Sequence, residues 1–166
     1  MVSATTLEYR VTKVLIVDNE RLIALDMAAT LAMCGHEVVG IAETAAEALE
    51  LAYNTAPQVA IVNVESEHGG CGIAAARMLQ ELLTAAIVLH TSGLDAQTMF
   101  AAEAVQPAAF LAKSASRHEL VRVVNALGIS RSARARKLAW EQERAARYGR
   151  KHSDDIQGLE APAQHQ

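Results

Sequence analysis

The feature of this sequence that most constrains its fold is a regular alternation of short apolar runs with longer segments of helical period. The apolar runs are bounded by turn-forming residues, which is typical of strands buried on both faces of a sheet. Five strands alternating with five helices imply right-handed crossovers and a parallel sheet with helices on both faces. The predicted strands cover residues 13–17, 37–41, 58–65, 86–90 and 108–112, and the predicted helices begin near residues 21, 45, 73, 96 and 117.

Local signals support two of the helix starts. Thr44 is followed three residues later by Glu47, and Ser116 by Glu119, which is the capping-box pattern. In the helix that begins at residue 21, apolar side chains recur at helical spacing and fall on one face. The residues of this face are Leu22, Leu25, Ala29, Ala32 and Met33.

Composition indicates a globular domain with a charged extension. The 166-residue chain is 51% hydrophobic and 20% charged, with a net charge of −4. Residues 1–130 hold seven basic and fourteen acidic residues, whereas residues 131–151 hold eight basic and two acidic ones. This split predicts a domain over residues 12–128, a basic helical extension over 130–151 and a disordered tail over 152–166. With two cysteines, no signal peptide and no bilayer-length apolar run, we expect a cytoplasmic protein without membrane contact.

Polar residues follow four of the five predicted strands. Asp18 and Asn19 come after the first strand, Asn63 ends the third, Thr91 follows the fourth and Lys113 follows the fifth. The carboxyl ends of parallel strands share one edge of a sheet, where sites of α/β proteins form. We therefore expect these five residues to lie close together.

These motifs resemble the receiver domain of two-component response regulators. The resemblance rests on residues 14–20, 35–40, 60–64, 91–92 and 110–113 and covers about residues 12–128. It implies a flavodoxin-like (βα)5 fold with strand order 2-1-3-4-5. It also implies Mg²⁺ and a partner histidine kinase, which phosphorylates an aspartate at the end of the third strand.

By position, each polar residue takes a role that the resemblance implies. The acids of the metal site fall at Asp18 and Asn19, and the backbone carbonyl that completes the metal shell falls at Glu65. The phospho-acceptor falls at Asn63, the phosphoryl contacts at Thr91 and Lys113, and an aromatic residue whose rotation reports phosphorylation at Phe110.

Two of these positions carry amides where the family has carboxylates. The Asn63 amide is neutral, and its nitrogen lone pair is delocalised, so it cannot form an acyl phosphate by the family's route. With Asn19 also neutral, Mg²⁺ should bind weakly or not at all, and no cofactor is expected. We therefore predict a pseudo-receiver, a protein-interaction module that is not an enzyme and does not need phosphorylation. Its partner would be a kinase, another regulator or a second copy, bound through the last helix–strand–helix face.

Other functions remain open. The chain could be a phosphorelay receiver in which Asn63 is bypassed or deamidated. It could also be a nucleic-acid-binding adaptor that acts through the basic residues 131–151. A transition-metal site is a less favoured hypothesis than a polar surface loop, and a structural or surface role is preferred for His90. The candidate ligands are Glu65, Glu67, His68, Cys71 and His90.

Overall fold

The computed structural model describes residues 10–65, 71–82, 85–93 and 96–129. All of these belong to one compact unit that extends to residue 131. The predicted basic extension and tail lie outside the described residues, and so do Glu67 and His68 of the loop metal hypothesis. None of the described helices is long and apolar enough to span a bilayer.

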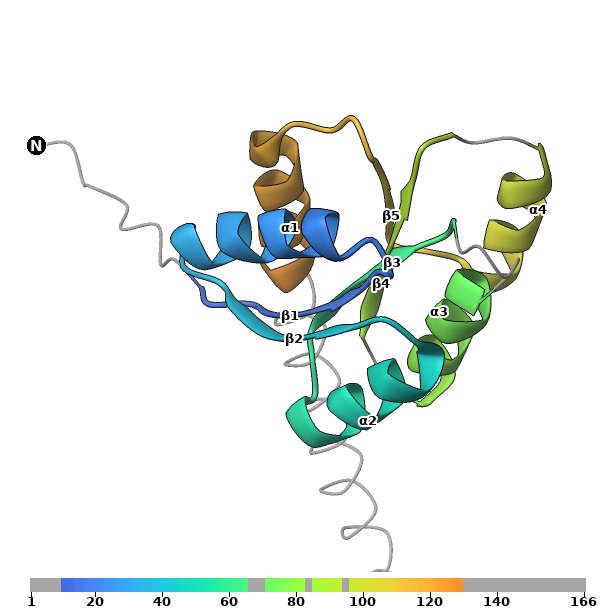
Figure 1. Ribbon diagram of the computed structural model, residues 1–166, viewed down its shortest axis with the longest axis horizontal. Coiled ribbons are helices and arrows are strands. Elements are labelled where there is room, and N and C mark those ends of the chain that lie inside the picture. Colours follow the sequence, from blue (N-terminus) through green and yellow to red (C-terminus); the bar gives the residue numbers. More distant parts are fainter. Residues whose placement is uncertain (1–9, 66–70, 83–84, 94–95, 130–166) are drawn as a thin grey trace, which may run out of the picture. The chain divides into compact units, whose positions relative to one another are not determined.

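The sheet matches the predicted α/β architecture. Its five strands are all parallel and follow the order β2-β1-β3-β4-β5, which confirms the flavodoxin-like topology (Figure 1). One irregularity interrupts the pairing, a register shift between Val14 and Leu15 where β1 meets β2. The strands are β1 (Lys13–Val17), β2 (Glu37–Ala42), β3 (Val59–Asn63), β4 (Ala86–Thr91) and β5 (Ala109–Ala112).

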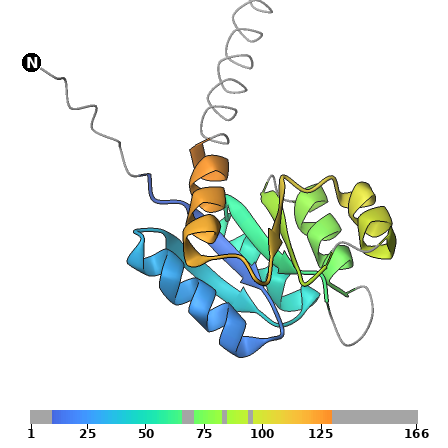
Figure 2. The same ribbon diagram turned by 90° about the horizontal axis from the view of Figure 1, so that it is seen from above.

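Helices cover both faces of the sheet. On one side lie α1 (Arg21–Met33) and a helix over residues 117–129, and on the other lie α2 (Ala45–Thr55), α3 (Cys71–Leu82) and α4 (Ala96–Val105) (Figures 1 and 2). Successive strand residues point to opposite faces, so each strand supplies two cores. In β1, Val14 and Ile16 pack under α1, whereas Leu15 and Val17 pack under α2 and α3.

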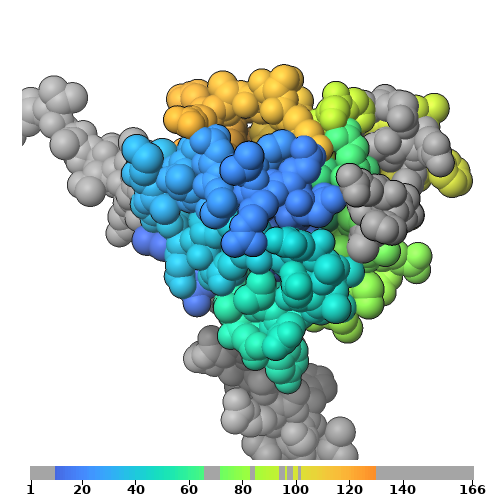
Figure 3. Space-filling model, viewed as in Figure 1, coloured from blue at the N-terminus to red at the C-terminus, as the bar shows by residue number. Residues whose placement is uncertain are grey.

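The buried face of α1 differs from the apolar face that the sequence predicted. Leu22 and Met33 are 83% and 87% exposed, while Ala24, Met27 and Leu31 are buried against the sheet. Apolar residues occur on most sides of α1, so their spacing alone does not reveal which face packs inward. The predicted face instead contributes to the open surface of α1, which is visible in Figure 3.

Both predicted capping boxes form the hydrogen bond to the hydroxyl of the capping residue. Thr44 Oγ1 accepts a hydrogen bond from the Glu47 amide at 3.2 Å, and Ser116 Oγ accepts one from the Glu119 amide at 3.2 Å. The returning bond of the first box differs from the prediction. The Glu47 carboxylate accepts from the Glu43 amide, at 2.9 Å, one residue before the capping threonine.

Candidate functional site

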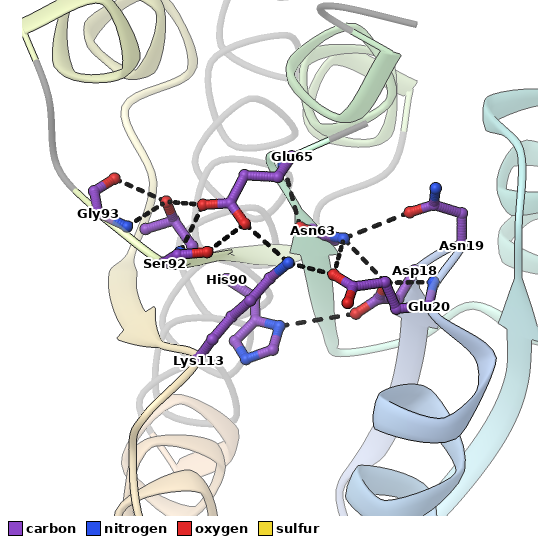
Figure 4. A network of polar contacts seen from close by, with 10 residues as sticks. Asp18, Asn19, Glu20, Asn63, Glu65, His90, Ser92, Gly93 and Lys113 are labelled. Carbon is purple, nitrogen blue, oxygen red and sulfur yellow. Dashed lines mark hydrogen bonds and ion pairs between the residues drawn. The ribbon is translucent and has the colours of Figure 1, made fainter. Parts of the chain in front are cut away.

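The strand ends bring the predicted polar residues to one edge of the sheet (Figure 4). Asp18 follows β1, Asn63 ends β3, Thr91 ends β4 and Lys113 follows β5. Asp18, Asn63 and Thr91 are almost fully buried, at 2%, 4% and 3% exposure. Buried polar groups must be hydrogen-bonded, so the contacts among them determine what the site can do.

The amide of Asn63 is held from both sides. Its Nδ2 donates to Asp18 Oδ1 at 2.9 Å and makes longer contacts, 3.4 Å each, with Asn19 Oδ1 and Glu20 Oε1. Its Oδ1 accepts from the Glu65 amide at 3.0 Å. These partners fix the orientation of the amide, because the reverse orientation would place two acceptor oxygens against each other at Asp18.

Asp18 is the buried carboxylate of the site. Its Oδ1 also accepts from the Glu20 backbone amide at 2.8 Å, and its Oδ2 lies 3.7 Å from His90 Nδ1, an ion-pair distance. Burial raises the pKa of Asp18, but His90, the Glu20 amide and Asn63 together lower it by more than burial raises it. The pKa of Asp18 is therefore below its ordinary value. The sequence offered His90 only as a candidate ligand of a transition-metal site and did not place it beside Asp18.

The side chain of Glu65 forms the second half of the site. Its carboxylate accepts from the Ser92 backbone amide at 2.6 Å and from the Ser92 hydroxyl. The Thr91 hydroxyl lies 3.2 Å from this carboxylate and 2.7 Å from the Gly93 carbonyl oxygen, so its one proton is shared between them. It also pairs with Lys113 Nζ at 2.7 Å. The hydrogen bonds from Lys113 and Ser92 lower the pKa of Glu65 to about 2. The resemblance implied a role for the backbone carbonyl of Glu65, and the transition-metal hypothesis a role for its side chain, but neither predicted the contacts of the carboxylate with Ser92 and Lys113.

Lys113 connects the residues around Asn63 and Asp18 with those around Glu65. Its ammonium pairs with both Glu20 and Glu65, and its side chain is 16% exposed. Burial lowers the pKa of Lys113, but the hydrogen bonds to Glu20 and Glu65 outweigh that effect and raise it above the ordinary value. The lysine therefore stays charged and holds two carboxylates that come from different strand ends.

A glycine allows α3 to begin against the site. A Cβ atom at Gly72 would lie 2.0 Å from the backbone oxygen of Asn63, closer than any real contact. Only glycine lets the first turn of α3 approach the end of β3 this closely. The chain thus returns to the end of β3 at Gly72.

Two of the carboxylates near Asn63 already have partners on an oxygen that a divalent cation could use. The acidic oxygens that would bind Mg²⁺ already receive the Asn63 amide N–H at Asp18 and the Lys113 ammonium at Glu20. Within the described part of the chain, no three His, Cys, Asp or Glu side chains are grouped to hold a metal. Asn19 is exposed beside the amide, and Phe110 is 37% exposed on β5.

Comparison with known proteins finds regulators and receiver domains among the proteins similar to this chain. No family model matches the sequence. The chain is 28% identical over 127 residues to the phyllosphere-induced regulator PhyR of Methylorubrum extorquens, a match over 75% of this chain and 47% of that protein. The chain thus spans about half the length of that curated relative.

Two solved structures share the fold. The receiver domain of a modulated diguanylate cyclase from Desulfovibrio desulfuricans G20 matches with a TM-score of 0.70 and 26% identity, over 75% of this chain and 99% of that one. The response regulator PhyR from Brucella abortus matches with a TM-score of 0.63 and 22% identity, over 80% and 54%. The identity to the second is low enough that it bears on the fold alone. The topology, the strand-end residues and the likenesses to PhyR of Methylorubrum extorquens and to the Desulfovibrio receiver domain agree that this chain has the fold and the strand-end pattern of response-regulator receiver domains.

Proposed function

We propose that this receiver acts as a phosphorylation-independent protein-interaction module of two-component signalling, and that it is not an enzyme. The observation that carries the proposal is the amide of Asn63, at the end of β3 where the family has its acceptor aspartate. The amide is not positioned for attack, because it donates to Asp18 and accepts from the Glu65 backbone.

The chemistry of residue 63 supports this reading. A carboxylate oxygen carries the charge and lone pairs that attack a phosphorus atom, whereas the amide is neutral. The Asn63 N–H also donates to Asp18, and the Lys113 ammonium balances the charge of Glu20, so both carboxylates already have partners without a metal. We therefore propose that Mg²⁺ binds weakly or not at all.

The face formed by α4, β5 and the helix over residues 117–129 is the proposed docking surface. Phe100 on α4 is 78% exposed, and Met99 and Phe110 are 38% and 37% exposed. Exposed aromatic side chains of this size are common anchors of protein interfaces. The proposed partner is a histidine kinase, another regulator or a second copy of the chain.

The covalent part of the proposal is tested with a phosphodonor. The full chain is incubated with acetyl phosphate and Mg²⁺ and analysed by intact-mass and peptide mass spectrometry, with Asn63→Asp as the matched control. We expect no adduct on the wild type and an acid-labile phosphate on N63D. A phosphate on residue 63 of the wild-type protein would overturn the proposal.

The docking part is tested by affinity capture with Phe100→Ala and Phe110→Ala variants. The surface variants should lose partners that the wild type retains with and without a phosphodonor. Leu82→Ala serves as the control, since Leu82 is an exposed apolar residue, at 69%, on α3. Equal capture by the wild type and both phenylalanine variants would exclude this face.

A further inference from the structure

We propose that the Glu65 carboxylate is a built-in ligand of an oxyanion site formed by Thr91, Ser92 and Lys113, and that removing it opens this site to inorganic phosphate. The inference rests on the proposed function, since it explains how the strand ends stay joined without phosphorylation. It concerns the regulation of the same edge of the sheet.

The donors around Glu65 form a site for an anion. Ser92 contributes a backbone amide at 2.6 Å and its hydroxyl, and Lys113 contributes an ammonium at 2.7 Å. The Thr91 hydroxyl lies 3.2 Å from the carboxylate and 2.7 Å from the Gly93 carbonyl oxygen, so its single proton is shared between the two acceptors. A backbone amide, hydroxyls and an ammonium that converge on two oxygens suit a carboxylate or a phosphate alike. Because the donors come from β4 and from the residue after β5, any anion at their centre joins those strand ends.

The ligand is tethered at a fixed place. Glu65 lies two residues after Asn63, whose Oδ1 accepts the Glu65 amide and holds the backbone there. A tethered group competes with free ligand at a high effective concentration, in the millimolar range for short connections. Free phosphate therefore has to displace a carboxylate that is always present, and the link from β3 to β4 and β5 does not depend on a kinase.

The acidic residues near Lys113 allow a matched control. Glu20 and Glu65 both pair with the ammonium, but of the two only Glu65 contacts Thr91 and Ser92. Glu65→Ala should empty the oxyanion site, whereas Glu20→Ala removes the same charge and leaves the site filled. Any general effect of net charge on phosphate binding would appear in both variants.

The experiment titrates inorganic phosphate into the full-length wild type, E65A and E20A at constant ionic strength, following the Ser92 amide by ¹H–¹⁵N NMR. We expect a saturable shift of this amide in E65A, with at least about tenfold weaker binding in the wild type and E20A. Acetate should compete with phosphate in E65A. Absence of a saturable Ser92 shift in E65A, or equal shifts in all three proteins, would overturn the proposal.

Should E65A fail to fold alone, phosphate and acetate must restore its folded spectrum in a concentration-dependent way, because a ligand of the native state stabilises it by mass action. Lack of restoration would then refute the inference. Its failure is distinguishable from that of the proposed function. A phosphate adduct on wild-type Asn63 would refute the proposed function. An E65A protein that does not bind phosphate would refute only the proposal that Glu65 is a built-in ligand.

Discussion

Asn63→Asp converts the hydrogen bond at the centre of the site into a repulsion. The Asn63 Nδ2 lies 2.9 Å from Asp18 Oδ1, and both side chains are almost fully buried. Two unit charges at that distance repel by about 6 kcal/mol at an effective dielectric constant of about 20. The pair can escape this cost if one carboxyl group takes up a proton.

Protonation sets a ceiling on the loss and makes it depend on pH. Keeping a proton on an aspartate with an ordinary pKa of about 3.9 costs about 4 kcal/mol at pH 7 and about 1.5 kcal/mol at pH 5, at about 1.4 kcal/mol per unit. We therefore expect N63D to lower the free energy of unfolding by about 2–4 kcal/mol at pH 7 without divalent cations, and by much less at pH 5. Millimolar Mg²⁺ should recover most of the loss at pH 7.

Urea unfolding followed by far-ultraviolet circular dichroism measures these differences. Asn54→Asp, an exposed change of the same chemistry on α2, is the control and should stay within about 0.5 kcal/mol of the wild type. The reasoning is refuted if N63D in a chelator loses less than about 1 kcal/mol at pH 7, where the repulsion should be near its ceiling. It is also refuted if the loss is the same at pH 5 and pH 7.

Three further changes test the site and the core. Glu65→Gln should lower the free energy of unfolding by about 1–2 kcal/mol at pH 7. The fall in the pKa of Glu65 from 4.5 to about 2 limits its stabilising contribution to about 3.4 kcal/mol. Because the carboxylate is 39% exposed beside Lys113, solvent screening leaves only part of that contribution. Because this folded-state pKa is depressed, the gain is complete above pH 4.5 and lost as pH falls towards 2, so wild type and E65Q should converge in acid unfolding. Gly72→Ala should cost about 1–3 kcal/mol and shift the Asn63 amide resonance, because its Cβ meets the Asn63 oxygen; an unchanged spectrum would contradict the close approach. Leu31→Ala, in the core under α1, should cost about 2–5 kcal/mol in urea unfolding, and a loss below 1 kcal/mol would contradict its burial.

The sequence predicted the sheet and the convergence at its edge because both follow from periodicity. Buried strands and helix caps each have a local signal in the sequence, and the alternation of strands with helices implies a parallel sheet. Parallel strands place Asp18, Asn63, Thr91 and Lys113 at one edge. The contacts that a side chain makes at this edge of the sheet have no such signal in the sequence. The Glu65 carboxylate reaches β4 and β5 through a rotamer that only the packed structure selects.

Two other findings lay beyond the sequence for related reasons. His90 occupies a strand position that apolar residues also occupy, so only the fold reveals that its ring faces Asp18. On α1, apolar side chains such as Leu22 and Leu31 lie on different sides, and the position of the sheet decides which of them is buried. Periodicity identifies a helix more reliably than it identifies the buried face of a helix with apolar residues on several sides.

The borders of the sheet have a consequence for self-assembly. β5 offers only four residues at one border, and at the other β2 joins its neighbour through a shifted register near Val14. Short or irregular outer strands are poor templates for an incoming strand, which protects such proteins against runaway polymerisation. Main-chain pairing of another molecule with either border of this sheet is therefore disfavoured.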